Sequence, residues 1–159
     1  MEIRFAQRQD IDAWMALVER VRDVFPGLET AGAMAEHRNT VLRFIAEQSA
    51  LCAVEGDQIA GALLFSRDSG VLCFLAVDPS YRRRQIARQL VTRMLDQLEE
   101  GKSVTVTTYR QEDPRGVAAR AFYRRMGFME GELTEEFGCP VQEFILPRQR
   151  ENEFKDAGI

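Results

Sequence analysis

The chain has 159 residues, 45% of them hydrophobic and 29% charged, which is the balance of an ordinary globular domain. No apolar run approaches the roughly 20 residues of a membrane-spanning helix, and the N-terminal residues lack the apolar stretch of a secretory signal. Because the formal net charge of -4 argues against a dedicated nucleic-acid-binding protein, we expect a cytoplasmic protein with neither membrane nor nucleic-acid partners.

The three cysteines are an odd number without the spacing of metal ligands, and no metal site is predicted. Cys52 and Cys73 lie in strand-like apolar runs, which favours buried small hydrophobic residues in a reducing compartment over a disulfide framework. Cys73 is interpreted as a packing residue, because nothing around it indicates a lowered thiol pKa.

The first segments predict one strand and one helix. Residues 3–6 form a short strand, and Asp10 occupies the N-cap position of the helix that follows. Apolar residues then recur at helical spacing, and Trp14, which is one of them, is predicted to lie in the core. Pro26-Gly27 ends this helix.

A second helix is predicted over residues 37–48. The glycine- and alanine-rich stretch before it, residues 28–36, is interpreted as a loop or a short helix. His37 is the only histidine of the chain and falls at the start of this helix. That position favours a surface or capping role for His37 over the role of a catalytic base.

The middle of the chain changes to the short apolar runs of strands. Residues 51–54 and 59–65 are predicted to be joined by a hairpin turn. Residues 71–77 form a third strand with almost no polar interruption, so it should lie centrally in a sheet that is covered on both faces. The remaining predicted elements are a helix over 86–98, a strand over 103–109, a helix opened by Asp113-Pro114 and closed by Gly127, and strands over 128–137 and 141–146 about a turn at 138–140.

In chain order these elements read β-α-α-β-β-β-α-β-α-β-β. This order indicates an α/β fold with a single mixed, twisted sheet and helices on both faces. We expect one domain over residues 1–147, followed by a charged C-terminal tail over residues 148–159.

Residues 77–87 carry the most informative chemical signal. They end a buried strand and open an amphipathic helix, with three consecutive arginines from Arg82 to Arg84. A helix start presents unpaired backbone N–H groups to an anion, and nearby arginines add charge-assisted hydrogen bonds to phosphate. A basic cluster on an acidic protein predicts one small anionic ligand, with a solvated basic face and a nucleic-acid patch as the alternatives.

The same segment resembles the cofactor motif of the GCN5-related N-acetyltransferase (GNAT) superfamily, which reads (Arg or Gln)-x-x-Gly-x-(Gly or Ala). Arg82 matches the first position and Ala87 the last, whereas Gln85 stands where glycine is expected. Gln85 must therefore hold a φ that an L-residue can bear or point its side chain away from the pyrophosphate.

A later segment, residues 118–128, resembles the superfamily's pattern Ala-x-x-(apolar)-Tyr-x-x-x-Gly-Phe. Gly116 replaces an asparagine that many members carry before this pattern. The matching residues are Ala119, Phe122, Tyr123, Gly127 and Phe128.

The resemblance implies a GNAT-like fold and an N-acetyltransferase that moves an acetyl group from acetyl-CoA to a primary amine by direct transfer in a ternary complex. Strands 71–77 and 103–109 would splay apart to admit the pantetheine arm, and Tyr123 would be the general acid that protonates the departing thiolate. The implied cofactor contacts are the main chain of Leu75, Ala76 and Val77, and the pyrophosphate turn of Arg82, Arg83, Arg84, Gln85, Ile86, Ala87 and Arg88.

The acceptor and the general base stay open. The acceptor is a small-molecule, peptide or protein amine, and a homodimer is a possible assembly. Gln85 and Gly116 motivate the main alternative, a catalytically silent acyl-CoA-binding regulatory module. The candidate bases are Glu29, Glu36, Glu112, Glu135 and Glu136, and the expected acceptor region also offers His37, Arg38, Arg43, Glu47 and Glu132.

Overall fold

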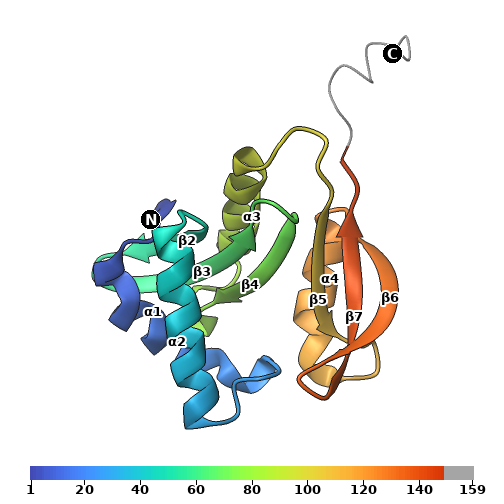
Figure 1. Cartoon of the computed structure of the whole chain (residues 1–159), viewed down its shortest axis with the longest axis horizontal. Coiled ribbons are helices and arrows are strands. Elements are labelled where there is room, and N and C mark those ends of the chain that lie inside the picture. The colour runs from blue at the N-terminus through green and yellow to red at the C-terminus, as the bar shows by residue number, and fades with distance from the viewer. Residues whose placement is uncertain (149–159) are drawn as a thin grey trace. The chain divides into compact units, whose positions relative to one another are not determined.

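A computed structural model describes residues 1–148 of the chain, and within them the helices and strands follow the predicted order (Figure 1). Residues 149–159 of the predicted tail lie outside the described residues. The elements are β1 (Glu2–Phe5), α1 (Ile11–Val21), α2 (Ala31–Ala46), β2 (Ala50–Glu55), β3 (Gln58–Ser66), β4 (Val71–Val77), α3 (Ile86–Gln97), β5 (Val104–Tyr109), α4 (Val117–Arg125), β6 (Met129–Glu136) and β7 (Cys139–Leu146).

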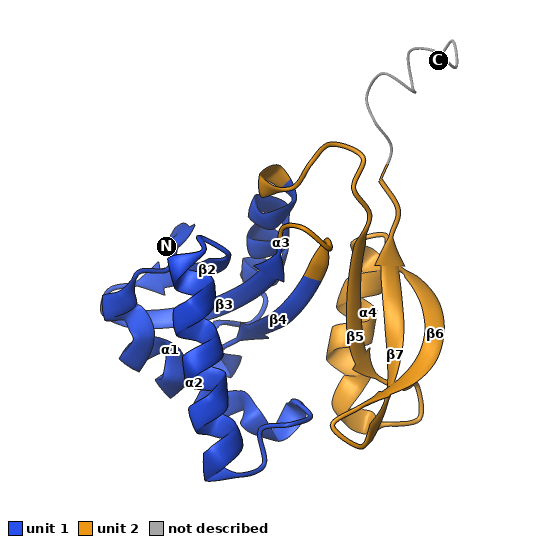
Figure 2. Cartoon of the chain, viewed as in Figure 1, with its two compact units in different colours: residues 1–66, 72–95 blue, residues 67–71, 96–159 orange. Residues whose placement is uncertain are grey.

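The described chain divides into two compact units (Figure 2). The first comprises residues 1–66 and 72–95, and the second comprises residues 67–71 and the described residues from 96 onward. Seven strands form one mixed sheet in the order β1-β2-β3-β4-β5-β7-β6, which confirms the predicted fold class. The register of the parallel β4–β5 pairing joins Val71 to Thr105, and both residues belong to the second unit.

Alternate residues of β3 serve opposite faces of the first unit. Ala62 and Leu64 belong to the core that α1 and α2 cover, with Trp14 fully buried there as predicted. Gly61 lies beneath Ile86 and its neighbours at the start of α3. Because successive strand residues point to opposite faces, helices cover both faces of this part of the sheet, as the sequence predicts.

The helix α2 begins earlier than the sequence indicates. Residues 31–36, predicted as a loop or short helix, already belong to α2, and Ala46 rather than Gln48 ends it. Thr30 provides the start signal, because its Oγ1 accepts a hydrogen bond from the backbone N–H of Ala33 at 3.0 Å. Gly32, two residues after the cap, obscured a helix start that Thr30 determines.

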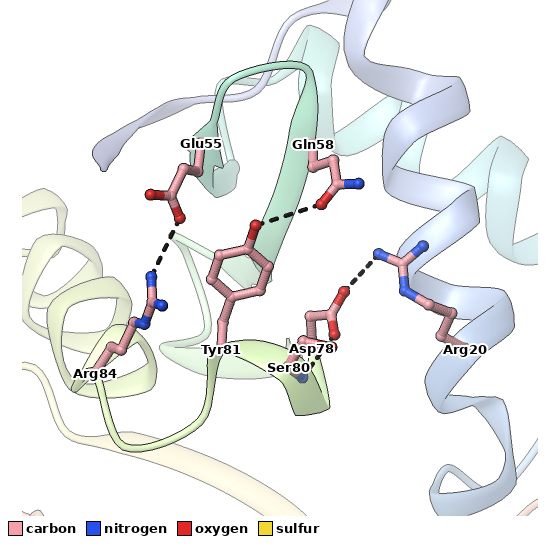
Figure 3. Close-up of a pocket in the computed structure, with 7 residues that line it drawn as sticks. All are labelled: Arg20, Glu55, Gln58, Asp78, Ser80, Tyr81 and Arg84. Atoms are coloured by element: carbon pink, nitrogen blue, oxygen red, sulfur yellow. Dashed lines mark hydrogen bonds and ion pairs between the residues drawn. The ribbon is translucent and has the colours of Figure 1, made fainter.

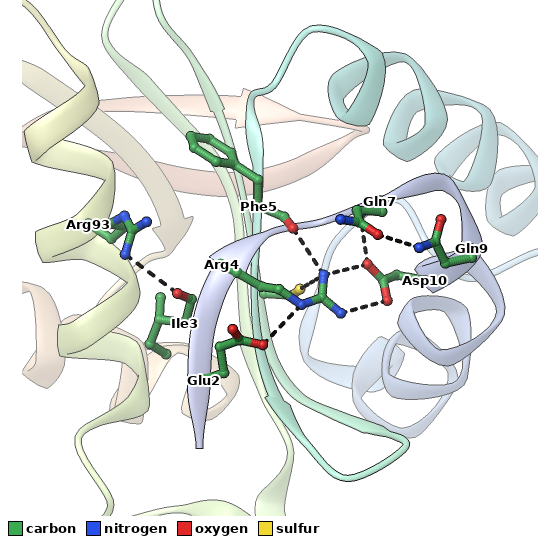
Figure 4. Close-up of polar contacts among 9 residues, drawn as sticks. Glu2, Ile3, Arg4, Phe5, Gln7, Gln9, Asp10 and Arg93 are labelled. Carbon is green, nitrogen blue, oxygen red and sulfur yellow. Dashed lines mark hydrogen bonds and ion pairs between the residues drawn. The ribbon is translucent and has the colours of Figure 1, made fainter.

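Asp10 occupies the N-cap position of α1 as predicted, but its side chain bonds elsewhere. Its side chain makes no capping hydrogen bond to α1. Instead it accepts hydrogen bonds from Arg4, whose Nη1 and Nη2 lie 2.7 and 3.0 Å away, and from the backbone N–H of Gln7 at 2.7 Å (Figure 4). The Arg4 hydrogen bond holds the pKa of Asp10 below its ordinary value. Asp10 therefore ties β1 to the segment before α1.

Strand β4 is less covered than the sequence predicts. Its bounds, Val71–Val77, match the prediction, and Leu72, Phe74 and Ala76 are buried. Cys73, predicted to be a packing residue, is exposed, whereas Cys52 is buried as predicted. The prediction from apolar composition therefore overestimated the burial of the β4 face that carries Cys73.

The position of His37 also differs from its prediction, because the ring packs inward rather than lying at the surface or at a cap. Its ring packs against Phe74 of β4 with centroids 4.8 Å apart, and Phe74 in turn contacts Phe25 at 4.6 Å. The His37 Nε2 atom is buried without a hydrogen-bond partner among residues 1–148. Burial lowers the pKa of His37 from 6.5 to about 4.

The half-buried imidazole of His37, with its buried Nε2 atom, predicts a loss of stability in acid. The folded chain keeps this imidazole neutral down to about pH 4, whereas the unfolded chain protonates it near pH 6.5. Stability is therefore complete above pH 6.5 and falls as the pH decreases towards 4. The full loss is about 3 kcal/mol. In urea unfolding at a series of pH values, His37→Gln should remove this fall between pH 6.5 and 5. Parallel pH curves for the two proteins would contradict the assignment.

The second unit is held together by a buried arginine of α4. The Nη1 atom of Arg120 donates to the carbonyl oxygen of Tyr109 at 3.1 Å and to Oε1 of Gln142 at 2.8 Å. Its Nη2 atom donates to Glu130 at 2.9 Å, and Arg124 contacts the same carboxylate oxygen. Arg120 thereby connects α4 with β5, β7 and β6.

The last hairpin turns one residue earlier than predicted. Glu136 pairs with Cys139, so the turn consists of Phe137 and Gly138, with φ of 52° and 71°. Pro140, predicted within the turn, lies in β7 opposite Glu135. No helix among residues 1–148 is long and apolar enough to cross a membrane.

Candidate active site

The turn between β4 and α3 is shaped by Asp78. Its Oδ1 accepts a hydrogen bond from the backbone N–H of Ser80 at 2.9 Å, and Pro79 occupies the first position of the short turn. Its Oδ2 lies 2.8 Å from Nη2 of Arg20 on α1. Asp78 itself is buried. Asp78 is therefore the residue that fixes where the turn leaves the sheet.

Two residues of this turn adopt left-handed backbone conformations. The φ angles of Arg83 and Gln85 are 67° and 58°. Gln85 thus takes the first of the two predicted options, holding the conformation that glycine adopts most readily, at a cost of roughly 1 kcal/mol for an L-residue. Its carbonyl oxygen accepts the hydrogen bond from Gln89 N at 3.0 Å, so α3 begins immediately after it.

The start of α3 can bind an anion. By helix geometry, the backbone N–H groups of Ile86, Ala87 and Arg88 have no carbonyl one turn before them within the helix. The first turn of α3 contains no acidic side chain, which leaves the positive end of the helix dipole uncompensated there.

The arginines around this turn differ in their partners. Arg82, Arg83 and Arg88 are exposed, and none has a carboxylate within 4.0 Å among residues 1–148. Arg84 is held: its Nη1 lies 3.4 Å from Oε2 of Glu55, and its guanidinium stacks over the ring of Tyr81 at 5.0 Å. Three arginines are therefore available to an anion, while the fourth braces the turn against the β2–β3 hairpin.

A pocket of about 490 Å³ adjoins this turn within the first unit (Figure 3). Two ion pairs, Arg20 with Asp78 and Arg84 with Glu55, lie on either side of the Tyr81 ring. The Tyr81 hydroxyl donates to Oε1 of Gln58 at 3.3 Å. The sequence analysis did not predict the pocket residues that lie outside the motif, because no sequence pattern marks them. The lining residues are Arg20, Glu55, Gln58, Asp78, Ser80, Tyr81 and Arg84.

Gly61 is a further contributor that the sequence did not single out. A Cβ at this position would lie 2.6 Å from Cγ2 of Ile86 and 3.0 Å from Cδ1 of Leu90. Its missing side chain therefore lets the start of α3 rest directly on β3. A glycine inside an otherwise apolar strand is the signal that could have identified it.

The β4 residues predicted to contact pantetheine end the strand just before this turn. Ala76 is buried, and Leu75 and Val77 are half-buried. From Leu72 onward β4 belongs to the first unit. The structure therefore places Leu75, Ala76 and Val77 in the same unit as all seven predicted residues from Arg82 to Arg88.

Tyr123 lies in the second unit, on the buried side of α4. Its ring contacts Phe122, Phe128 and Phe144 at centroid distances of 5.4, 5.3 and 6.0 Å. Burial raises the pKa of the phenol above its ordinary value. Within residues 1–148 its hydroxyl has no hydrogen-bond partner. Tyr123 is thus a fixed, protonated phenol whose hydrogen-bonding capacity is unused.

The left-handed turn can be tested by substitution. Gln85→Gly should change the free energy of unfolding by less than about 1 kcal/mol, because relief of the φ strain offsets the added chain entropy of glycine. Gln85→Val should destabilise by roughly 1–2 kcal/mol, since a β-branched residue tolerates this φ poorly. Arg88→Val, at an ordinary helical position, is the control in urea unfolding. Equal losses for the two valine variants would contradict a left-handed Gln85.

Residues 26–144 match the family model described as "Acetyltransferase (GNAT) domain". None of the curated proteins searched matches the chain.

Solved structures with the same fold span almost the whole chain. A GNAT-family acetyltransferase from Bacillus cereus is 20% identical with a TM-score of 0.70, covering 94% of this chain and 98% of its own. A ribosomal-protein-alanine N-acetyltransferase from Brucella melitensis is 17% identical with a TM-score of 0.72, covering 92% and 99%. The PaiA N-acetyltransferase from Thermoplasma acidophilum, solved with coenzyme A, is 17% identical with a TM-score of 0.65, covering 89% and 96%.

Proposed function

Because the chain belongs to the GNAT acetyltransferase family, we propose that it transfers an acetyl group from acetyl-CoA to a primary amine in a ternary complex. The amine belongs to a small molecule, a peptide or a protein. The observation that carries the proposal is the turn before α3, where Arg83 and Gln85 are left-handed and the first helical N–H groups follow at once.

This turn suits the pyrophosphate of coenzyme A. Backbone N–H groups at a helix start favour phosphate oxygens, and Arg82, Arg83 and Arg88 add positive charge without a protein carboxylate to neutralise it. The main chain of Leu75, Ala76 and Val77 precedes the turn and would hold the pantetheine arm. Gln85 stands where the family pattern has glycine, and its left-handed φ is one that glycine adopts readily. Its side chain, and not its φ, therefore departs from the family pattern.

In the proposed reaction, acetyl-CoA supplies the acyl group as an activated thioester. The neutral amine forms a bond to the carbonyl carbon, the carbon–sulfur bond breaks, and the thiolate accepts a proton from the Tyr123 hydroxyl. The proton that the nitrogen loses restores the phenol, directly or through solvent. Since a thiol has a pKa of about 8.5 and a phenol about 10, this transfer is uphill, and the raised pKa of Tyr123 makes it more so.

Calorimetric titration with acetyl-CoA, together with a transfer assay on a panel of amines, tests the function. Binding with acetylation of at least one amine is the expected result. Tight binding without transfer to any amine would instead indicate the catalytically silent acyl-CoA-binding module. The absence of binding would overturn both functions.

The phosphate contact has its own prediction. Arg82→Ala should weaken coenzyme A binding by about 10-fold, because a charge-assisted hydrogen bond is lost, and should leave binding of a pantetheine analogue without phosphates unchanged. Arg8→Ala removes another exposed arginine from the first unit and serves as the control. Equal losses of affinity for both ligands would count against the assignment.

A further inference from the structure

Strand β6 is an open edge of the second unit. It ends the strand order and pairs with β7 alone among the described strands. Six of its residues are exposed along Met129–Glu136. An edge of this kind presents unpaired backbone groups to which another strand can add.

The hairpin register shows which backbone groups face outward. Pro140 lies opposite Glu135, and proline has no N–H to donate, so this position is a non-hydrogen-bonded pair. Because such pairs alternate along an antiparallel ladder, Leu133 opposite Gln142 is of the same type. The N–H and C=O groups of Leu133 and Glu135 therefore point away from β7, whereas those of Thr134 and Glu136 face it.

This edge carries three exposed apolar side chains. Met129, Leu133 and Phe137 are 57%, 61% and 79% exposed. Phe137 is also left-handed, with φ of 52°, which is uncommon for a bulky residue and costs stability. The hairpin that presents them is anchored, since Arg110 donates to the carbonyl oxygens of Thr134 and Val141 at 2.9 and 3.1 Å.

The charged side chains of the β6–β7 hairpin are all negative. Residues 127–147 contain five glutamates and no lysine or arginine. Arg120 and Arg124 neutralise Glu130, and Glu136 accepts a hydrogen bond from Thr107 at 2.9 Å. Glu132 and Glu135, both exposed, have no basic partner within 4.0 Å among residues 1–148.

We propose that the β6 edge binds an extended, lysine- or arginine-rich polypeptide segment as an added strand. The outward backbone groups of Leu133 and Glu135 would provide the hydrogen bonds, and the two unpaired glutamates would select basic side chains. A second copy of this chain fits less well, because edge-to-edge pairing would bring like charges together across the new ladder. The inference does not rest on the proposed acetyl transfer.

The test uses the full chain without acetyl-CoA and a capped peptide of about eight residues that alternates lysine with valine. Fluorescence anisotropy should show salt-sensitive binding of this peptide and no binding of the matched glutamate–valine peptide. Amide exchange followed by NMR should slow at Leu133 and Glu135 on binding, with little change at Thr134 and Glu136, which already face β7.

Charge-reversal variants distinguish peptide binding at the β6 edge from attraction by the overall negative charge of the protein. The double variant Glu132→Lys/Glu135→Lys should weaken peptide binding by at least about 10-fold. The matched double variant Asp96→Lys/Glu99→Lys, which reverses two exposed charges at and just after the end of α3, should bind within about 2-fold of the original chain. Equal weakening by both variants, equal binding of both peptides, or a dimer dispersed by the β6 variant would overturn the proposal.

Discussion

Tyr123→Phe should lower the turnover of acetyl transfer by about 10²-fold or more while leaving acetyl-CoA affinity unchanged. The substitution removes only the hydroxyl, which has no hydrogen-bond partner within residues 1–148. The ring contacts with Phe122, Phe128 and Phe144 remain. A loss of turnover would therefore reflect the missing proton donor and not a change in the packing of α4.

Steady-state rates measured from about pH 6 to 9 check this prediction. The thiol changes protonation within this range, and an alkyl amine changes protonation above it. The original chain should depend on the phenol throughout, because burial raises the pKa of Tyr123 and keeps it protonated. The control is Tyr109→Phe, which removes a hydroxyl from another buried tyrosine of the second unit. Turnover of Tyr123→Phe equal to that of the original chain across this range would exclude the general-acid role.

Arg120→Ala should lower the free energy of unfolding by about 3–4 kcal/mol. The side chain is only 4% exposed. Its loss leaves the buried Gln142 oxygen and the Tyr109 carbonyl without this donor, and removes a guanidinium that packs over Phe144 at 4.9 Å.

Arg124→Ala is the matched control, because Arg124 contacts the same Glu130 oxygen but is 49% exposed. Exposed ion pairs contribute at most about 1 kcal/mol, so urea unfolding should separate the two variants by at least about 2 kcal/mol. Similar losses for both would mean that the Glu130 ion pair, and not the buried network, stabilises α4.

Much of the fold was predictable because the chain marks its strands and helices locally. The bounds of β4 were predicted to the residue, since a run of apolar residues lies between the turn signals Ser69-Gly70 and Asp78-Pro79. Asp113 caps the turn before α4 as predicted, accepting a hydrogen bond from Arg115 N at 2.9 Å. Local spacing and turn chemistry are sufficient for features of this kind.

The errors arose where a tertiary partner decides the role of a residue. Asp10 holds the predicted N-cap position of α1, but its side chain binds Arg4 on β1 instead of capping the helix. His37 at a supposed helix start is drawn inward by Phe74, which lies far along the sequence. Arg120, for which the sequence analysis predicted no specific role, is buried by its partners on three strands. No local pattern contains these partners.

The candidate site divides in the same way. The motif predicted the turn and its arginines. For Gln85 it left two options, and the left-handed φ of 58° corresponds to the first of them. The pocket residues Arg20 and Glu55 come from distant elements. Their contribution depends on how α1 and the β2–β3 hairpin approach the turn, which the motif does not encode.

Gly61 has a consequence for how this protein can vary. It lies in the middle of a buried strand and has no side chain with which to meet a ligand, yet any larger residue there would push against Ile86 and Leu90. The start of α3, and with it the left-handed turn, would have to shift. Selection for ligand affinity should therefore restrict a position that no ligand touches, and a survey of natural variation that scored only contact residues would overlook it.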